Sequence, residues 1–304
     1  CIYIFENYIN FSSNYGSASK WWLHGSLKTL DQELTKLNEE RIASSLNFFK
    51  GSPQKILLNL CKKYKSDNIF WNRRYETEHY NRDKEIILQL KNYNVFVKTF
   101  CGSVLIEPWN VLGKQQQRLK VFTPYKNSLI NNHTIAQPIS TPKSLSLFKI
   151  KESITLDDLK LRNESWMKKF EAKWNTGERF ALKKLDEFIH QNIDNYHLNR
   201  DMMSKDGTSK LSPHLNFGEI SPKYIWNKIV KEDFSRISEG KKVFLSEVIW
   251  REFAINLMLL YPNLNSKNMK TSFKNFIWIN DHENLKKWTF GKTGYPIVDA
   301  AMNQ

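Results

Sequence analysis

The chain has 304 residues, of which 40% are hydrophobic and 13% aromatic, so it can bury one large core or two medium ones. This composition excludes disorder over the whole chain. Lys and Arg number 46 and Asp and Glu number 31, and the net charge of +15 favours an anionic partner such as nucleic acid or a phosphorylated ligand. The basic residues are spread along the whole length, so a binding patch must be assembled by folding.

Cysteine content and hydropathy narrow the environment of the chain. The three cysteines, Cys1, Cys61 and Cys101, form no CxxC pair, so the sequence predicts neither a zinc site nor a disulfide framework and suits a reducing, cytoplasmic compartment. The longest apolar runs, at 86–90 and 255–261, are far shorter than the roughly 18 residues that span a bilayer, so we expect no membrane partner. The chain starts in a strand-like run and stops in helical sequence without a cap, which predicts a fragment cut at both ends.

The first third of the chain alternates between β-rich runs and helical stretches. Strands are predicted at 2–5, 46–49, 68–70, 95–97 and 104–106, and helices at 21–37, 53–63 and 82–91. This alternation predicts a Rossmann-like parallel sheet with helices on both faces. Ser52 followed by Pro53 predicts a capped helix start. No GxGxxG motif follows any of these strands, which disfavours a nicotinamide-dependent enzyme.

A proline-containing segment separates this part from the rest. Residues 123–147 hold Pro124, Pro138 and Pro142 among Asn, Ser and Thr with little periodicity, which is typical of a long interdomain connection. Further along, helices are predicted at 159–173, 178–193, 213–216, 222–231 and 241–260. We therefore expect an α/β domain at 1–122, a linker at 123–155 and an all-α domain at 156–304.

One loop of the second half concentrates glycine and hydroxyl side chains. It reads Asp206-Gly207-Thr208-Ser209-Lys210-Leu211-Ser212-Pro213 and leads into a predicted helix start. Backbone N–H groups at such a start, together with hydroxyls, can hold a phosphate. The other interpretation is an ordinary capped turn, and composition leaves both open. The next Ser-Pro start, at Ser221, is interpreted as purely structural.

The predicted helix at 241–260 is apolar on nearly every face, which marks it as central to its domain. One stripe breaks the pattern, because Glu247, Trp250, Arg251 and Ala254 are spaced so that they share a face. A carboxylate and a guanidinium in a buried helix are costly unless they are paired or face a cavity. This stripe is therefore either an internal Glu247–Arg251 ion pair or the wall of a polar pocket.

Seven segments of the chain carry a family resemblance. They are Trp21-Trp22-Leu23-His24 with Ser26-Leu27, Trp71-Asn72-Arg73-Arg74-Tyr75-Glu76, Val121-Phe122-Thr123-Pro124-Tyr125, Asp206-Gly207-Thr208-Ser209-Lys210-Leu211-Ser212-Pro213, Phe217-Gly218-Glu219-Ile220-Ser221-Pro222, Glu247-Val248-Ile249-Trp250-Arg251-Glu252-Phe253 and Gly291-Lys292-Thr293-Gly294-Tyr295-Pro296-Ile297-Val298-Asp299-Ala300. In this order they resemble the DNA photolyase/cryptochrome family, and most of all its cyclobutane pyrimidine dimer photolyases. The resemblance covers essentially the whole chain.

The resemblance implies an N-terminal α/β antenna domain, a long linker and a helical domain that holds FAD. It also implies a second, antenna chromophore whose identity stays open. By this likeness, FAD would contact Tyr196, Thr208, Ser209, Lys210, Leu211, Ser212 and Arg251, chiefly around its phosphates and ribityl chain. Glu78 and His79 stand where folate-binding members have Asn and Glu, and Ser266 stands where they have Lys, which disfavours folate as the antenna.

The resemblance also implies the residues that meet DNA. Glu247 matches the position that hydrogen-bonds the pyrimidine dimer, and Trp250 matches the tryptophan that packs on the flipped-out dimer; base flipping is described behaviour of photolyases. Trp278 matches the outermost tryptophan of the chain that photoreduces flavin, although the residues alone leave Trp278 and Trp288 open to packing, stacking or electron transfer. The DNA-binding surface would further include Arg251, Glu252, Phe253 and Ala254.

The function implied by the resemblance is light-driven DNA repair by a carbon–carbon lyase. Excited, reduced FAD would donate an electron to a cyclobutane pyrimidine dimer, the ring would split and the electron would return, with no metal needed. We expect a cytoplasmic monomer that acts on damaged DNA. The first strand of the antenna domain and the end of the FAD domain are expected to be missing, so the fragment alone is expected to be inactive. The alternatives are a cryptochrome-type blue-light photoreceptor without repair activity and a cofactor-free basic nucleic-acid-binding protein.

Overall fold

The computed structural model describes residues 1–6, 16–40, 44–162, 166–231, 233–277 and 279–303. The chain divides into two units, Cys1–Leu260 and Tyr261–Gln304. Trp278, predicted to pass electrons to flavin, lies outside the described residues. In the described part of the chain, no helix combines the length and apolar character needed to cross a membrane.

Two short parallel ladders form the sheet structure of the first unit. Strand β1 (Ile2–Phe5) pairs with β2 (Asn47–Lys50), and β3 (Asn68–Asn72) pairs with β4 (Phe96–Phe100). The predicted parallel pairing is confirmed. The strand predicted at 104–106 is wrong, because the Leu105 N–H donates to the Glu252 carboxylate instead of to a neighbouring strand.

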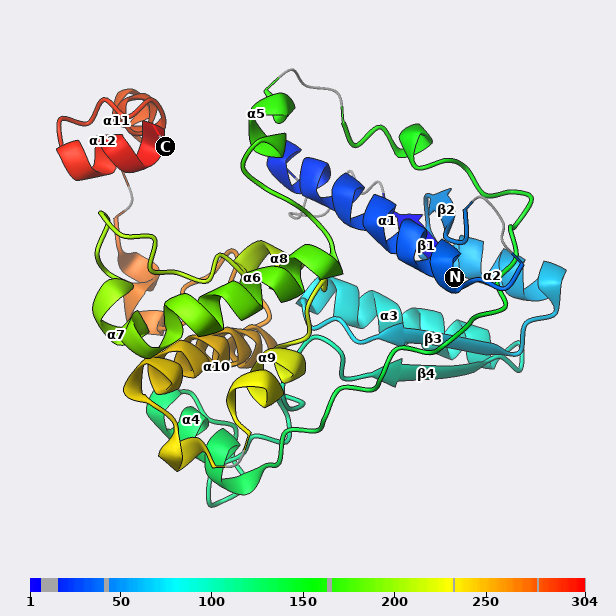
Figure 1. The fold of residues 1–304 in the computed structure, drawn as a ribbon, viewed down its shortest axis with the longest axis horizontal. Coiled ribbons are helices and arrows are strands. Elements are labelled where there is room, and N and C mark those ends of the chain that lie inside the picture. The colour runs from blue at the N-terminus through cyan, green and yellow to red at the C-terminus, as the bar shows by residue number, and fades with distance from the viewer. Residues whose placement is uncertain (7–15, 41–43, 163–165, 232, 278, 304) are drawn as a thin grey trace. The chain divides into compact units, whose positions relative to one another are not determined.

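Helices pack on both faces of the β1–β2 ladder, whereas one face of β3–β4 is left exposed at Phe70 and Phe96, so the predicted cover of both faces is confirmed only in part (Figure 1). On one face, α1 (Ser17–Leu37) packs with Phe5 and Phe48 through Leu23 and Leu27. On the other face, apolar residues of α2 (Pro53–Tyr64) and α3 (Thr77–Lys91) pack with strand residues, namely Ile4, Ile69 and Val97. Neighbouring residues of β1 thus point to opposite faces, as the period of a strand requires.

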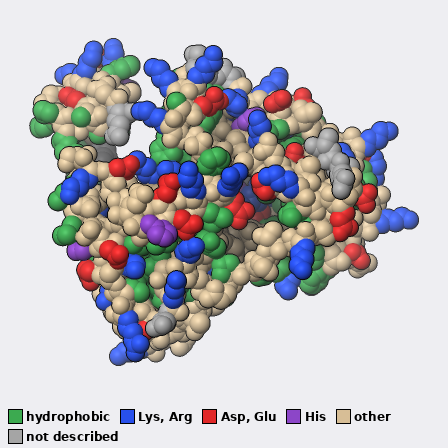
Figure 2. All heavy atoms as spheres, viewed as in Figure 1, with side chains coloured by type: hydrophobic (Ala, Val, Ile, Leu, Met, Phe, Trp, Pro, Cys, Tyr) green, Lys and Arg blue, Asp and Glu red, His purple; other side chains and the backbone are tan. Residues whose placement is uncertain are grey.

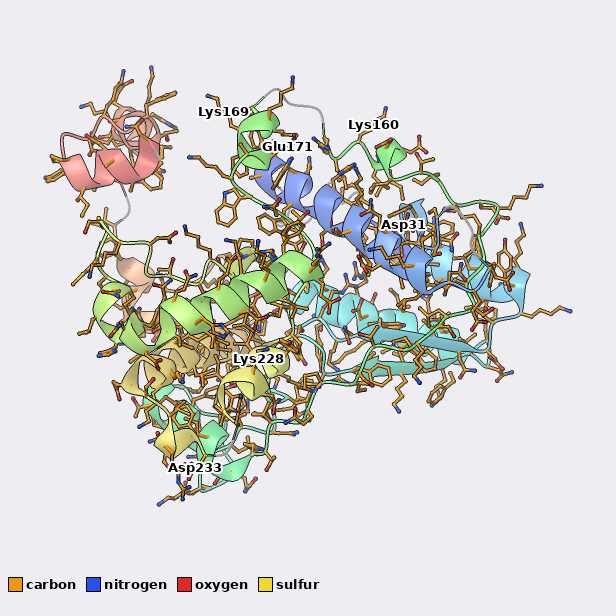
Figure 3. All side chains as sticks on the ribbon, in the orientation of Figure 1. Asp31, Lys160, Lys169, Glu171, Lys228 and Asp233 are labelled. Atoms are coloured by element: carbon orange, nitrogen blue, oxygen red, sulfur yellow. The ribbon has the colours of Figure 1, made fainter. Side chains whose placement is uncertain are left out.

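Side-chain bonds to the backbone hold the α/β part in register. The hydroxyl of Ser52 accepts from the Lys55 N–H, which confirms the predicted cap of α2. The Asp31 carboxylate of α1 accepts from the backbone N–H groups of Ser45 and Leu46, at 2.9 and 2.7 Å, and so ties this helix to the start of β2 (Figure 3).

The remainder of the first unit consists of helices and loops, and several of its helices pack around α10. Its helices are α4 (Phe122–Asn132), α5 (Met167–Glu171), α6 (Glu178–Gln191), α7 (Tyr196–Asn199), α8 (Ser212–Asn216), α9 (Pro222–Ile229) and α10 (Glu239–Leu260), with short 3-10 helices η1 (Asp157–Leu159), η2 (Ile193–Asn195) and η3 (Phe234–Arg236). The helices α4, α7 and α9 all contact α10, which is central as predicted (Figure 1). Lys228 of α9 also pairs with Asp186 of α6 at 3.1 Å (Figure 3).

Two helix predictions need correction. The helix predicted at 159–173 is only η1 and α5 among the described residues, because Lys160 takes a left-handed backbone with φ 53° and ends the turn before it. The predicted linker begins with α4, whose Tyr125 and Leu129 are fully buried in the helical core. Pro124 does not prevent this helix, because it occupies the first turn, where its missing N–H has no intrahelical partner.

Close backbone contact brings α7 to α10. A Cβ on Gly240 would lie 2.1 Å from the carbonyl oxygen of Ile193, so only glycine permits this approach of α10 to η2. Tyr196, at the start of α7, consequently packs against Phe244 of α10 with ring centroids 5.5 Å apart.

The second unit holds η4 (Thr271–Asn275), α11 (His282–Thr289) and α12 (Pro296–Asn303). The loop before α12 is held by Asp299, whose carboxylate accepts from the backbone N–H groups of Thr293 and Gly294 at 2.8 and 3.0 Å. The Thr293 hydroxyl also donates to this carboxylate. These hydrogen bonds lower the pKa of Asp299, and the bond from the Thr293 hydroxyl has the largest effect. The Gly-Lys-Thr-Gly motif of the sequence therefore forms the loop from which α12 begins.

Candidate functional site

A cavity of about 2240 Å³ lies within the unit Cys1–Leu260. At one end it is lined by residues that follow the carboxyl ends of the strands, among them Glu6, Lys50 and Arg74. At the other end it is lined by helical residues, among them Tyr196 and Phe244. The carboxyl ends of parallel strands are a common place for ligands, and the size exceeds that of ordinary small-molecule pockets.

The hydroxyl-rich loop reaches this cavity. Ser209, Leu211 and Ser212 are among the residues that line it. The capped-turn interpretation is only partly met, because Leu211 rather than a hydroxyl residue is the N-cap of α8, and Ser209 accepts one long bond, 3.4 Å, from the Leu211 N–H. Ser212 is exposed on the cavity wall, so its hydroxyl can donate to a ligand. By contrast, Ser221 caps α9 as expected.

Backbone constraints shape the same loop. Gly207 is buried, and a Cβ there would lie 2.7 Å from the carbonyl oxygen of Asn199. Lys210 adopts a left-handed backbone with φ 53°, and its ammonium pairs with Asp206 at 2.5 Å. Lys210 and the exposed Thr208 do not line the cavity, so their predicted contact with FAD stays a prediction.

Tyr196 and Leu211 form an apolar part of the cavity wall. Tyr196 meets Phe188 and Phe244 edge-on, and the guanidinium of Arg200 lies 5.5 Å from the centre of its ring. Burial raises the pKa of the Tyr196 phenol, so the side chain stays neutral. Both residues were predicted to contact the cofactor, and both face the cavity.

Glu247 lies on the cavity wall but does not pair with Arg251. Its carboxylate accepts from the Arg200 guanidinium at 2.5 Å, and this bond raises the pKa of Arg200. Of the two alternatives for this stripe, the internal Glu247–Arg251 ion pair is therefore wrong, and the Glu247 side chain is 37% exposed rather than buried. The sequence analysis missed Arg200 because it lies 47 positions from its partner along the chain.

Arg251 also lines the cavity, and polar groups of the protein hold its guanidinium in place. Its guanidinium donates to the Ser103 carbonyl at 2.7 Å and lies 3.3 Å from the carboxylate of Glu252. Glu252 is fully buried and accepts from the Leu105 N–H at 2.8 Å. Burial raises the pKa of Glu252 to about 8, and the positive charge of Arg251 opposes this shift.

The burial of Glu252 and Phe253 contradicts the contacts with DNA that were predicted for these two residues. Glu252 has no exposed surface and Phe253 is only 5% exposed within the helical core. On a helix these positions point away from the stripe that holds Glu247. Ala254 is exposed but does not line the cavity, so its contact with DNA stays a prediction.

Trp250 lies beside the cavity rather than on its wall. The indole is 45% exposed and stacks on the ring of Phe122, with centroids 3.6 Å apart and planes 5° apart. It shares its helix face with Glu247, one turn earlier. The two residues predicted to bind the dimer therefore lie together on α10, while Trp278 lies outside the described residues.

A buried polar cluster behind the hydroxyl-rich loop was missed. The Glu219 carboxylate accepts from the indole N–H of Trp22 at 3.2 Å and from the Gly177 N–H at 2.7 Å, and it bonds the His214 imidazole at 2.5 Å. His214 is fully buried and belongs to α8, which carries Ser212. The sequence signal was Glu219 within one of the seven segments, five positions after His214.

The strand end of the cavity is strongly charged. Arg74 bonds Glu6 at 3.2 Å and Asp83 at 2.6 Å, and Arg82 pairs with both acids. His79 lines the cavity here, whereas Glu78 does not. The expectation about folate rests partly on Ser266 of the second unit and stays a prediction.

Charges on the visible face are mixed. Figure 2 shows Lys and Arg side chains spread over this face and interspersed with Asp and Glu, without one continuous basic patch. Among the described residues, no three His, Cys, Asp or Glu side chains are grouped so that they could hold a metal ion.

Comparison with known families shows to which family the chain belongs. The family profile described as DNA photolyase matches residues 1–143, and the one described as FAD binding domain of DNA photolyase matches residues 244–304. The chain belongs to the DNA photolyase/cryptochrome family. The α/β-plus-helical fold and FAD as the family's cofactor are thereby confirmed, and a cofactor-free nucleic-acid-binding protein is disfavoured.

Individual relatives agree. The deoxyribodipyrimidine photo-lyase of Agrobacterium fabrum is 37% identical over 95% of this chain and 60% of its own length. The crystal structure of a class III photolyase from Agrobacterium tumefaciens superposes with a TM-score of 0.90 at 36% identity, over 100% of this chain and 62% of that one. Cryptochrome-2 of Arabidopsis thaliana is 26% identical over 95% of this chain and 49% of its own length. The photolyase chains thus extend well beyond the part that this chain matches.

The residues around the cavity suit FAD. Hydroxyl donors at Ser209 and Ser212 and a guanidinium at Arg251 match the needs of a pyrophosphate, and Tyr196 and Leu211 provide apolar surface for rings. The direct observation is this donor set, because Ser209 and Ser212 of one loop and Arg251 of α10 line the same cavity.

Proposed function

We propose that this protein splits cyclobutane pyrimidine dimers in DNA with light, using FAD. The observation that carries the proposal is the pairing of a carboxylate and an indole, Glu247 and Trp250, on one helix face at the edge of a cavity that also presents Ser209 and Ser212. The cavity would hold the cofactor while the helix face receives the flipped-out lesion. The relatives named above as photo-lyases support this reading.

Each residue has a distinct part in this proposal. Glu247 accepts a hydrogen bond from a base N–H and so orients the dimer, and Trp250 offers a flat apolar surface. Arg200 donates to Glu247 and so orients its carboxylate. When bound, reduced FAD supplies the photoexcited electron that opens the cyclobutane ring.

The cofactor end of the cavity yields a prediction. Replacing both Ser209 and Ser212 by alanine is expected to lower flavin affinity by about tenfold, because each lost hydroxyl removes about 0.5–1.5 kcal/mol of hydrogen bonding. Flavin released per protein on denaturation, read from its visible absorbance, measures the effect. Ser26→Ala on α1 is a matched control, and flavin content equal to the parent in the double variant would contradict the role of the loop.

The activity itself is tested directly in the protein as expressed from its gene. Flavin-loaded, reduced protein is mixed with an oligonucleotide that contains one thymine dimer, and intact dimers are counted after blue light and after darkness. We expect loss of dimers only in light. No loss under illumination, with flavin present, would overturn the proposed function and favour a cryptochrome-type photoreceptor, the alternative that the likeness to Cryptochrome-2 supports.

The strand end of the cavity is where we place the second, antenna chromophore. Its lining mixes cations with apolar strand residues, as at Lys50 and Phe5, which suits a flat anionic dye. We also propose that the protein acts in the cytoplasm as a monomer.

A further inference from the structure

Trp250 lies in a corner formed by aromatic rings from two helices. Its indole stacks on Phe122, the first residue of α4. Phe253 meets both rings nearly edge-on, with centroids 5.8 Å from Trp250 and 5.9 Å from Phe122. Phe253 in turn packs on Tyr125, which is fully buried. The corner is thus built on the rigid core that joins α4 to α10.

This corner fixes the plane of a side chain that would otherwise move. An indole that is 45% exposed on a helix surface can sample several rotamers, and ordering it on binding costs conformational entropy. Phe122 covers one face of the indole, and Phe253, itself 5% exposed, limits rotation from the side. The exposed part of Trp250 is therefore held in one orientation before a ligand arrives.

The orientation suits a heterocycle that also reaches Glu247. The carboxylate lies one helical turn before the indole on the same face, and Arg200 fixes it from the other side. A flat ligand can stack on Trp250 and donate an N–H to Glu247 only if the two groups keep their relative positions. Phe122 provides that constraint on the indole.

We propose that Phe122 is a positioning residue for lesion recognition, which stacks on Trp250 and preorganises the indole as a platform for flipped-out pyrimidines. The proposal rests on the lesion-binding role proposed above for Trp250. Phe122 acts through Trp250 and does not line the cavity. Its effect is on discrimination between damaged and undamaged DNA, because undamaged duplex is held through its phosphates.

The test is the ratio of two dissociation constants in the protein as expressed from its gene: that for an undamaged duplex and that for the same duplex with one thymine dimer. Phe122→Leu keeps an apolar side chain but removes the stacking surface, and Phe122→Tyr keeps the ring. We expect Phe122→Leu to lower the ratio by about 3- to 10-fold, the factor that one aromatic pair contributes. We expect Phe122→Tyr to keep the ratio of the parent protein. The affinity for undamaged DNA should be unchanged in both variants.

Control variants separate the possible failures. Phe70→Leu changes an aromatic residue that is 59% exposed on β3 and is expected to leave the ratio unchanged. If Trp250→Ala does not lower the ratio, the lesion-binding role of Trp250 fails, and the proposal for Phe122 falls with it. If Trp250→Ala lowers the ratio but Phe122→Leu does not, only the proposal for Phe122 is overturned. A higher ratio in Phe122→Leu also overturns it, because the stack would then hold the indole away from the lesion.

Discussion

Replacing Glu219 by alanine is expected to lower the free energy of unfolding by about 3–5 kcal/mol, the cost of removing one partner from a buried charged cluster. The carboxylate is 3% exposed and satisfies three groups at once, the Trp22 indole N–H, the Gly177 N–H and His214. Without it, these groups remain buried without an acceptor. Loss of the carboxylate also removes its bond to His214 of α8, the helix that carries Ser212 at the cavity.

Urea unfolding measures this change, with Glu33→Ala as its control. Glu33 pairs with Lys36 on the exposed surface of α1, where such pairs contribute little, so no measurable change is expected. A Glu219→Ala variant as stable as the control variant would show that the cluster does not hold the loop in place.

The second large effect is a pH dependence of stability that arises from Glu252. Burial raises its pKa from 4.5 to about 8 in the folded chain, against the opposing charges of Arg251 and Lys223. Because the folded state binds the proton more tightly than the unfolded state, the contribution of Glu252 to stability is complete below pH 4.5 and is lost as the pH rises through about 8. The free energy of unfolding should fall by no more than about 1.4 kcal/mol per pH unit in that window.

Glu252→Gln isolates this contribution, because the amide keeps the shape of the neutral acid. Urea unfolding between about pH 5 and 9 should give a flatter profile for this variant than for the parent chain. Glu85→Gln, on the exposed face of α3, should keep the parent slope. Equal slopes in the parent and in Glu252→Gln would contradict a raised pKa at Glu252.

Local patterns in the sequence predicted the fold well. The parallel strands, the helices packed on them and the central position of α10 follow from alternation and periodicity, which neighbouring residues carry. The helix α4 was missed because it contains Pro124 and three asparagines, and its stability comes from burying Tyr125 and Leu129 against α10. Tertiary packing of this kind leaves little trace in local composition.

The site was predictable only where its residues are neighbours in sequence. Glu247 and Trp250 were placed on one face by helix spacing, and the structure agrees. The partner of Glu247 was not predictable, because Arg200 reaches it from another helix. The burial of Glu252 was missed for the same reason, since its acceptor role depends on the backbone of Leu105, 147 positions away.

The central claim is that Glu247 acts on the pyrimidine dimer and not on the fold. The decisive measurement is the number of dimers split per absorbed photon by Glu247→Gln in the flavin-loaded protein, with the free energy of unfolding measured alongside. Because Glu247 is 37% exposed and its pair with Arg200 is near the surface, the substitution should change stability by less than about 1 kcal/mol. The account predicts unchanged flavin content and a repair yield lower by about tenfold, the cost of one charge-assisted hydrogen bond. A variant that repairs at the parent yield but unfolds at clearly lower urea would contradict it.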